Sequence, residues 1–216
     1  MEARRFSFDV LGSTTSALSY PASAERRATL PRATLLLAHG AGAPQTHPWM
    51  VRIAHAVSAR GLDVVTFNFL YAQASRRAPD RNDVLEATFR AAIAAVRTQG
   101  EVVASRLFIG GKSMGGRIAT QVAAAGGAGA LDVAGLVLLG YPLHPPGKPG
   151  QRRASHLPNV RAPMLFVQGS RDAFGTPAEL GPIVADLGPR TRLFVVEGGD
   201  HSLATSKRTG PTLEAT

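Results

Sequence analysis

The sequence alternates short, mostly apolar segments with longer segments whose apolar residues recur at helical spacing. Four of the short segments are apolar almost throughout, which is typical of a parallel sheet covered by helices on both faces. We therefore predict a doubly wound, mostly parallel α/β sheet flanked by helices. The predicted strands are 4–12, a segment around 16–22, 33–40, 62–69, 105–111, 133–142, 162–169 and 191–199. The predicted helices are 47–61, 82–98 (with an N-cap at Asn82 or Asp80 and an end at Gly100), 114–127 and 176–188.

The length and composition of the chain limit the kind of protein it can form. The chain has 216 residues, enough for one good-sized core but not for two ordinary domains, so we expect a single domain over residues 1–216. Its apolar runs are far shorter than a membrane span, and no apolar run follows the charged start, so we expect a cytoplasmic protein without a signal peptide. With no cysteine, disulfides and thiolate chemistry are excluded.

The net charge of +9 comes mostly from scattered arginines. Four arginine doublets, at 4–5, 26–27, 76–77 and 152–153, fall where we expect loops or a sheet edge. A nucleic-acid surface would instead need a clustered basic stripe, with aromatic residues for base stacking. We therefore expect no nucleic-acid partner, while a weak attraction to anionic surfaces or substrates remains compatible with the charge.

Residues 109–117, with the sequence IGGKSMGGR, fit two motifs. Residues 111–113 (GKS) match the end of a phosphate-binding loop, which needs a glycine five residues earlier so that the backbone can wrap the phosphates. That position is Arg106, within a predicted strand. The next strand also lacks the terminal aspartate that would hold magnesium. Both observations argue against a nucleotide-binding loop.

The second motif is G-x-S-x-G, the sharp strand-to-helix turn that presents a nucleophilic serine. Side chains two residues before and two residues after the serine would collide, and Gly111 and Gly115 occupy those positions. This motif occurs often by chance, but a predicted strand before it and a predicted helix after it make it specific. Ser113 is therefore the candidate nucleophile.

A serine hydroxyl needs a base to take its proton, and the base is a histidine that a carboxylate orients. In this kind of sheet the chain order is serine, acid, histidine, each after a strand. Asp172 and His201 follow the strands at 162–169 and 191–199, so they are the predicted partners. Asp200 is adjacent to His201, but the side chains of neighbouring residues diverge, so we do not expect Asp200 to orient the histidine ring. Lys112, beside Ser113, is expected to point away into solvent.

The other histidines are expected to be structural or exposed. We expect His39 to make structural hydrogen bonds and His55 to lie on a helix surface or at the edge of the core. For His47, His144 and His156, on loops, solvent exposure is favoured over substrate contact.

Attack by such a serine on a carbonyl gives a tetrahedral intermediate, whose oxyanion needs two backbone N–H donors. Met114 is expected to supply one, at the N-terminus of a helix. The other is expected from HGAGA at 39–43, where Ala41 is favoured and Gly42 is the alternative.

With these motifs placed, the chain resembles an α/β-hydrolase, in particular the small, cap-less members related to dienelactone hydrolases. The likeness covers about residues 30–208 and is carried by HGAGA, FNF, GGKSMGGR, GYPLHPPGKP, QGSRDAFGTPAEL and GGDHS. It implies a triad of Ser113, Asp172 and His201, and hydrolysis of an ester-like bond without metal or cofactor. Some relatives of this group act within larger assemblies.

The sequence departs from that family in two ways. Dienelactone hydrolases use a cysteine nucleophile, which this chain lacks, so their substrate is not carried over. The family also closes its sheet with a long C-terminal helix, whereas here residues 202–216 are broken at Gly210-Pro211. We expect that helix to be short or missing, which would expose a strand edge and favour a homodimer or another partner there.

No cap insertion is visible, because only the basic, proline-rich loop at 143–161 separates two late strands. An open site bordered by Trp49, Tyr141 and this loop favours small, accessible acyl groups. The prediction is a serine hydrolase acting on carboxylic esters or thioesters; an acyltransferase or a peptidase could use the same residues. The contrasting prediction is a non-catalytic binding or scaffold protein on the same fold.

Overall fold

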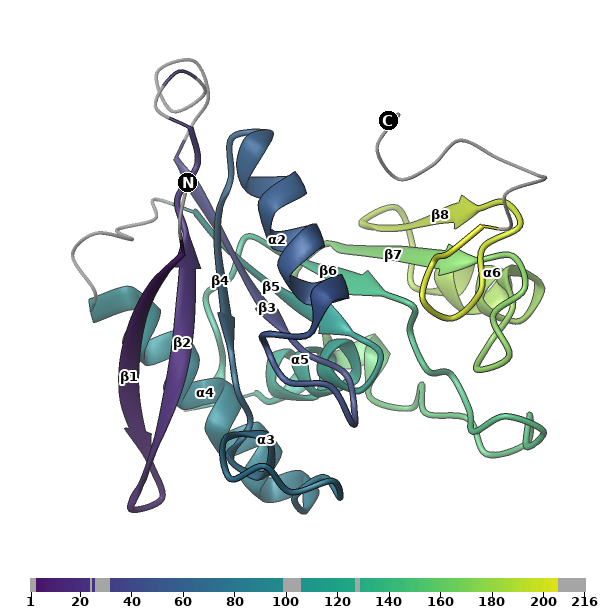
Figure 1. Cartoon of the computed structure of the whole chain (residues 1–216). Coiled ribbons are helices and arrows are strands. Elements are labelled where there is room, and N and C mark those ends of the chain that lie inside the picture. The colour runs from purple at the N-terminus through teal and green to yellow at the C-terminus, as the bar shows by residue number, and fades with distance from the viewer. Residues whose placement is uncertain (1–2, 24, 26–31, 99–105, 127–128, 206–216) are drawn as a thin grey trace.

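The computed structural model describes residues 3–23, 25, 32–98, 106–126 and 129–205, and these residues form one eight-stranded sheet with helices on both faces (Figure 1). The strands are β1 (Arg4–Val10), β2 (Ser13–Tyr20), β3 (Ala33–Ala38), β4 (Asp63–Phe67), β5 (Arg106–Lys112), β6 (Gly135–Leu139), β7 (Met164–Gly169) and β8 (Thr191–Val196). The helices are α2 (Pro48–Ala59), α3 (Leu70–Gln73), α4 (Asn82–Thr98), α5 (Met114–Ala124), α6 (Pro177–Asp186) and the 3₁₀ turn η3 (Leu157–Asn159).

The strand order is β1-β2-β4-β3-β5-β6-β7-β8. β1 and β2 form an antiparallel hairpin, β2 pairs antiparallel with β4, and every later pairing is parallel. This confirms the predicted mostly parallel α/β sheet. Order in space departs from order in sequence only at β3 and β4, because β4 lies between β2 and β3 and the chain then crosses to the other side of β3 to form β5.

The two faces of the sheet can be followed through consecutive residues of β3. Leu36 packs in the larger core, together with α4, α5 and α6, whereas Leu35 and Leu37 pack in a smaller core against α2. Successive side chains of a strand point to opposite faces, so an uninterrupted apolar strand needs cover on both. β3 is buried between two layers, and that burial explains its composition.

The predicted N-cap of α4, Asn82 or Asp80, was wrong. The helix begins at Asn82, whose Oδ1 accepts a hydrogen bond from Arg117, and the carboxylate of Asp80 accepts the N–H of Tyr71. The first-turn amides of Val84 and Leu85 instead bond to a backbone carbonyl. The side chains of Asn82 and Asp80, which the local sequence pattern predicted as caps, therefore bond to residues outside the helix N-terminus instead. Gly100, the expected end, lies outside the described residues.

β8 is an edge strand, and one face near it is open. Leu165 on β7 and Phe194 on β8 are 37% and 58% exposed, on the face opposite α6, where no described helix lies over them (Figure 1). The prediction of a short or missing C-terminal helix concerns residues 202–216, of which 202–205 form no helix and 206–216 lie outside the described part of the chain. A homodimer at this edge therefore stays a prediction.

The described arginine doublets, at 4–5, 76–77 and 152–153, are exposed, as expected. The doublet at 26–27 lies outside the described residues. Among the described helices, none has the length and apolar character needed to cross a membrane.

Gly110→Ala in β5 should strongly destabilise the fold, because the added Cβ would lie 1.9 Å from the backbone oxygen of Val137 on β6. We expect the free energy of unfolding to fall by about 3 kcal/mol or more in urea denaturation. Gly181→Ala, in α6, is the matched control: its Cβ meets nothing within 4 Å, and helix propensity should raise stability by up to about 1 kcal/mol. Equal stability of the two variants would contradict this account of the sheet centre.

Candidate active site

Ser113 occupies the turn between β5 and α5. Its backbone has φ 51° and ψ −117°, a conformation that residues other than glycine rarely adopt. Its N–H donates to the carbonyl of Leu139 at 2.9 Å. Such backbone strain persists only where the surrounding structure enforces it. The strand-to-helix turn predicted from the sequence is present, with the hydroxyl at the carboxyl edge of the sheet.

The glycines around Ser113 are required by close backbone contacts. A Cβ on Gly111 would lie 2.5 Å from the backbone carbon of Gly115, and a Cβ on Gly115 would lie 2.5 Å from the carbonyl oxygen of Ala38. Both distances are shorter than real Cβ atoms tolerate. The first turn of α5 therefore sits directly on β3 and β5, which fixes the serine.

The structure brings Ser113, His201 and Asp172 together. The Nε2 of His201 lies 2.8 Å from the Oγ of Ser113, and its Nδ1 lies 2.8 and 2.9 Å from the two carboxylate oxygens of Asp172. A carboxylate can only accept, so Nδ1 carries a proton and Nε2 of the neutral ring faces the hydroxyl as an acceptor. This arrangement can remove a proton from the serine.

Asp172 is completely buried, and its oxygens are satisfied by more than the histidine. One oxygen accepts the N–H of Phe174 and the other accepts the Nε2–H of Gln168, both at 2.8 Å. Gln168 in turn donates to the carbonyl of Gly175 at 2.7 Å and accepts the N–H of Tyr141 at 2.8 Å. These bonds hold the carboxylate facing His201, and sequence reasoning missed Gln168.

Phe174 also contacts the histidine directly. Its ring stacks on that of His201, with centroids 4.1 Å apart and an interplanar angle of 26°. The stacking fixes the plane of the imidazole on one side. Sequence reasoning missed this residue too, although it stands two positions after Asp172.

The loop after β3 lies beside Ser113. The carbonyl of Gly40 accepts hydrogen bonds from the Nδ1 of His39 at 2.8 Å and the hydroxyl of Tyr71 at 3.3 Å. The C=O and N–H of a trans peptide point in opposite directions, so the N–H of Ala41 points away from those two side chains. A Cβ on Gly40 would lie 3.5 Å from the Cβ of Ser113, so this loop packs against the serine.

The second expected donor is Met114, the first residue of α5. The first N–H groups of a helix have no partner within it, and the helix dipole favours negative charge at that end. No described residue accepts a hydrogen bond from the amide of Met114 or Ala41. Their placement supports the predicted oxyanion hole, with Gly42, at φ 74°, as the alternative donor.

Asp200 and three of the other histidines have structural or exposed positions in the fold. Asp200 accepts the N–H groups of Ser202 and Ala204 and so shapes the loop rather than orienting His201, as expected. His47 and His55 are exposed, and His39 is buried with its Nε2 accepting the N–H of Phe69, also as expected.

The expected exposure of two loop histidines was wrong. His144 is buried, with Nε2 3.0 Å from the Oε1 of Glu179 on α6. His156 is half-buried, with Nε2 2.8 Å from the Oγ1 of Thr120 on α5. Each ring finds a polar partner on a helix, which ties the basic loop down onto the fold.

The expectation for Lys112 was also wrong. The side chain is buried, and its Nζ donates to the backbone carbonyl of His201 at 2.5 Å while lying 5.9 Å from the ring centroid of Trp49. Burial lowers the pKa of Lys112 to about 8, against the opposing attraction of Asp172 and Asp200. Adjacent residues of a strand point to opposite faces, so Lys112 reaches the loop of His201 from the α2 side.

Two cavities meet at Ser113 and share Ala41, Ser113 and Phe174. The larger, of about 460 Å³, is lined by Trp49, Met50, Lys112 and His201. The smaller, of about 320 Å³, extends along α4 and α5. The predicted contact residue Trp49 therefore lines the site.

Tyr141, the other predicted contact residue, lines neither cavity. It is fully buried, its ring packs against Phe166, and its hydroxyl donates to the carbonyl of Arg153 at 2.7 Å. The ring is buried and its hydroxyl is bonded to the backbone, so the expectation of substrate contact is corrected here. Arg117 and Arg153, which line the smaller cavity, were not singled out from the sequence.

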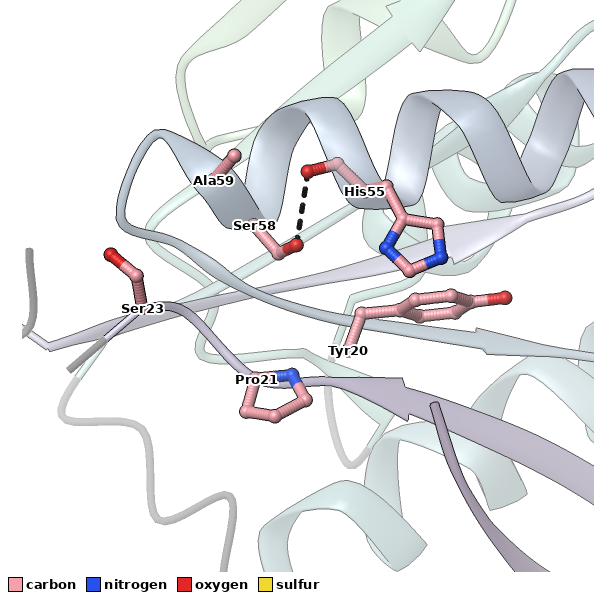
Figure 2. A pocket seen from close by; sticks show the side chains of 6 residues that line it. All are labelled: Tyr20, Pro21, Ser23, His55, Ser58 and Ala59. Atoms are coloured by element: carbon pink, nitrogen blue, oxygen red, sulfur yellow. Dashed lines mark hydrogen bonds between the residues drawn. The ribbon is translucent and has the colours of Figure 1, made fainter. Parts of the chain in front are cut away.

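A third hollow, of about 170 Å³, lies between β2 and α2 (Figure 2). Figure 2 shows the ring of Tyr20 beneath that of His55, with centroids 5.0 Å apart, and the hydroxyl of Ser58 donating to the carbonyl of His55. The described residues that line it include none from the cavities at Ser113 and no carboxylate, so they form no triad. The described residues also contain no group of three His, Cys, Asp or Glu side chains placed to hold a metal ion.

The sequence matches the protein family described as an alpha/beta hydrolase domain over residues 31–216, so the chain belongs to this family. It is an α/β-hydrolase by fold, and no cap domain interrupts the described segment between β6 and β7.

Solved structures of bacterial proteins share this fold. An α/β serine hydrolase without lid from Xanthomonas campestris has a TM-score of 0.73 at 20% identity, over 94% of this chain and 87% of that chain. An α/β serine hydrolase homologue from Coxiella burnetii has a TM-score of 0.72 at 20% identity, over 93% and 90%. Dienelactone hydrolase from Anabaena variabilis has a TM-score of 0.71 at 19% identity, over 94% and 88%.

The buried His39 makes stability depend on pH. Burial lowers the pKa of His39 to about 4, below the value of 6.5 for a free histidine, so the unfolded chain binds the proton more tightly. The contribution of this group to stability is therefore complete above pH 6.5 and is lost as pH falls towards 4, at up to about 1.4 kcal/mol per pH unit.

Urea denaturation between pH 7 and pH 4.5 tests this by comparison with His39→Gln, which does not titrate. The stability difference between the two proteins should shrink steadily below pH 6.5. A difference that stays constant over this range would contradict the assignment.

Proposed function

We propose that this protein is a serine hydrolase that cleaves carboxylic ester or thioester bonds through Ser113, His201 and Asp172. One observation carries the proposal: an unbroken series of hydrogen bonds runs from the hydroxyl of Ser113 through both ring nitrogens of His201 to the buried carboxylate of Asp172. The family, and solved structures of esterases with the same fold, support the reaction class.

In the first step, the Oγ of Ser113 attacks the carbonyl carbon of the ester while the Nε2 of His201 takes its proton. The carboxylate of Asp172 stabilises the resulting imidazolium. The carbonyl oxygen becomes an oxyanion, which the N–H groups of Met114 and Ala41 are placed to bind. The N-terminal end of the α5 dipole adds to this stabilisation.

In the second step, the tetrahedral intermediate collapses and the bond to the leaving oxygen or sulfur breaks. His201 gives its proton to that atom, and the acyl group remains on Ser113. Water then attacks the acyl-enzyme with His201 again as the base, which releases the acid and restores the hydroxyl. Water is the only co-substrate that the reaction consumes.

The site favours small, accessible acyl groups. No cap domain covers the serine within the described part of the chain, and the cavities beside it, of about 460 and 320 Å³, fit a short ester rather than a long chain. A similar structure is described as a serine hydrolase without lid, which supports an uncovered site.

A fluorophosphonate probe should label the wild-type protein at Ser113, because the probe reacts with serines that a base has activated. Ser113→Ala should lose both labelling and p-nitrophenyl acetate hydrolysis, by about 1,000-fold or more in kcat. Ser7→Ala, on the exposed edge strand β1, is the control and should keep both. Turnover or biological activity that survives Ser113→Ala would favour the scaffold function instead.

Lys112→Met should weaken catalysis without unfolding the protein. The substitution keeps an apolar chain beside Trp49 but removes the donor to the carbonyl of His201, so the catalytic loop loses one of its supports. We expect kcat to fall about tenfold with p-nitrophenyl acetate, the value of a hydrogen bond from a charged group. Thermal unfolding should shift little, because the removed ammonium is costly to bury.

The matched control is Lys148→Met, the same change on an exposed loop, which should leave kcat unaltered. Equal kcat in wild type and Lys112→Met would mean that Lys112 does not position His201.

A further inference from the structure

The smaller cavity at Ser113 has a charge pattern that ester hydrolysis alone does not require. Two arginines, Arg117 on α5 and Arg153 on the basic loop, line it together with Asp80, Asn82 and Leu85. Among the described residues, no carboxylate lies within ion-pair distance of either arginine. Asp80 is engaged elsewhere, by Arg76 and by the N–H of Tyr71.

Arg117 is held in place by neutral groups. One of its terminal nitrogens donates to the Oδ1 of Asn82 and to the Oε1 of Gln121, both at 3.1 Å. A guanidinium has five N–H donors, so capacity remains for an anionic ligand. Burial lowers the pKa of Arg117, and the nearby charge of Arg153 lowers it further, while Tyr141 and Glu86 act in the opposite direction.

The backbone of Arg153 is also fixed. Its N–H donates to the carbonyl of Leu143 and its carbonyl accepts the hydroxyl of Tyr141, both at 2.7 Å. The buried anchor Tyr141 therefore keeps Arg153 at the rim of the cavity. The charges of Arg117 and Arg153 lie near enough to repel each other, and an anion between them would relieve that repulsion.

The position of His201 decides which half of the substrate enters this cavity. His201 must give its proton to the leaving oxygen, so the leaving group lies on its side. His201 lines the larger cavity and not the smaller one. The leaving alcohol or thiol therefore belongs beside Trp49 and Met50, and the acyl half extends past Met114 towards Arg117.

We propose that Arg117 and Arg153 bind a carboxylate at the far end of the acyl group, so that the preferred substrates are mono-esters or mono-thioesters of short dicarboxylic acids. This inference rests on the proposed function. Arg117 lies four residues after Ser113, about one turn or 6 Å along α5. An acyl chain of about four to six carbons spans that distance. The adjacent Glu86 and Asp80 favour a singly charged carboxylate over a doubly charged phosphate.

The test compares kcat/KM for mono-p-nitrophenyl glutarate and for its uncharged analogue p-nitrophenyl pentanoate. Wild type should prefer the glutarate ester about tenfold or more, the value of a charge-assisted hydrogen bond. Arg117→Gln and Arg153→Gln should each reduce that preference about tenfold. Arg152→Gln, an exposed neighbour that does not line the cavity, should leave both values unchanged.

The outcomes separate the two proposals. If Ser113 is labelled by the fluorophosphonate and the pentanoate ester is cleaved, but the glutarate ester is not preferred, the carboxylate site is wrong and the proposed function stands. If neither labelling nor cleavage occurs in folded protein, both fail. If an arginine-dependent preference appears instead for 4-acetoxybenzoate over phenyl acetate, the carboxylate lies on the leaving group and our assignment of the cavities is overturned.

Discussion

The hydrogen bond between the Oγ of Ser113 and the Nε2 of His201 depends on nearly every other feature of the fold. It joins residues 88 positions apart in the chain across a distance of 2.8 Å. Parallel strands make this possible, because their carboxyl ends share one edge of the sheet. β5, β7 and β8 deliver the hydroxyl, the carboxylate and the imidazole to that edge.

The geometry of that hydrogen bond is fixed by contacts that hold Ser113 at one end and His201 at the other. At the serine, Gly111 and Gly115 allow α5 to lie directly on the strands, which enforces the strained backbone. At the histidine, Asp172 fixes one ring nitrogen, Phe174 fixes the ring plane and Lys112 holds the backbone carbonyl. Catalytic groups need such rigid support, because a small displacement slows the reaction severely.

The sequence predicted the fold and the meeting of the three side chains well, for identifiable reasons. Strand and helix patterns are periodic, and G-x-S-x-G is local, so both can be found without knowledge of packing. The chain order of Ser113, Asp172 and His201 follows from the topology. Their catalytic roles, and those of Ala41 and Met114, remain predictions for activity measurements.

The errors share one cause, which is that long-range partners cannot be found from local sequence. Lys112 and His144 were expected in solvent, but each finds a carbonyl or carboxylate across the fold. Tyr141 was expected at the substrate, but its hydroxyl bonds to Arg153 instead. Arg117 and Arg153, distant in sequence, become a pair only once α5 and the basic loop pack together.

Trapping of the acyl-enzyme tests the central claim most directly. The protein is mixed with p-nitrophenyl acetate, quenched in acid within the first turnover, digested and analysed by mass spectrometry. Our account predicts one acetyl group, carried by Ser113, on the peptide that spans β5 and α5. Turnover of the ester with the acetyl group on another residue, or with no acetylated intermediate and no initial burst of p-nitrophenolate, would contradict it.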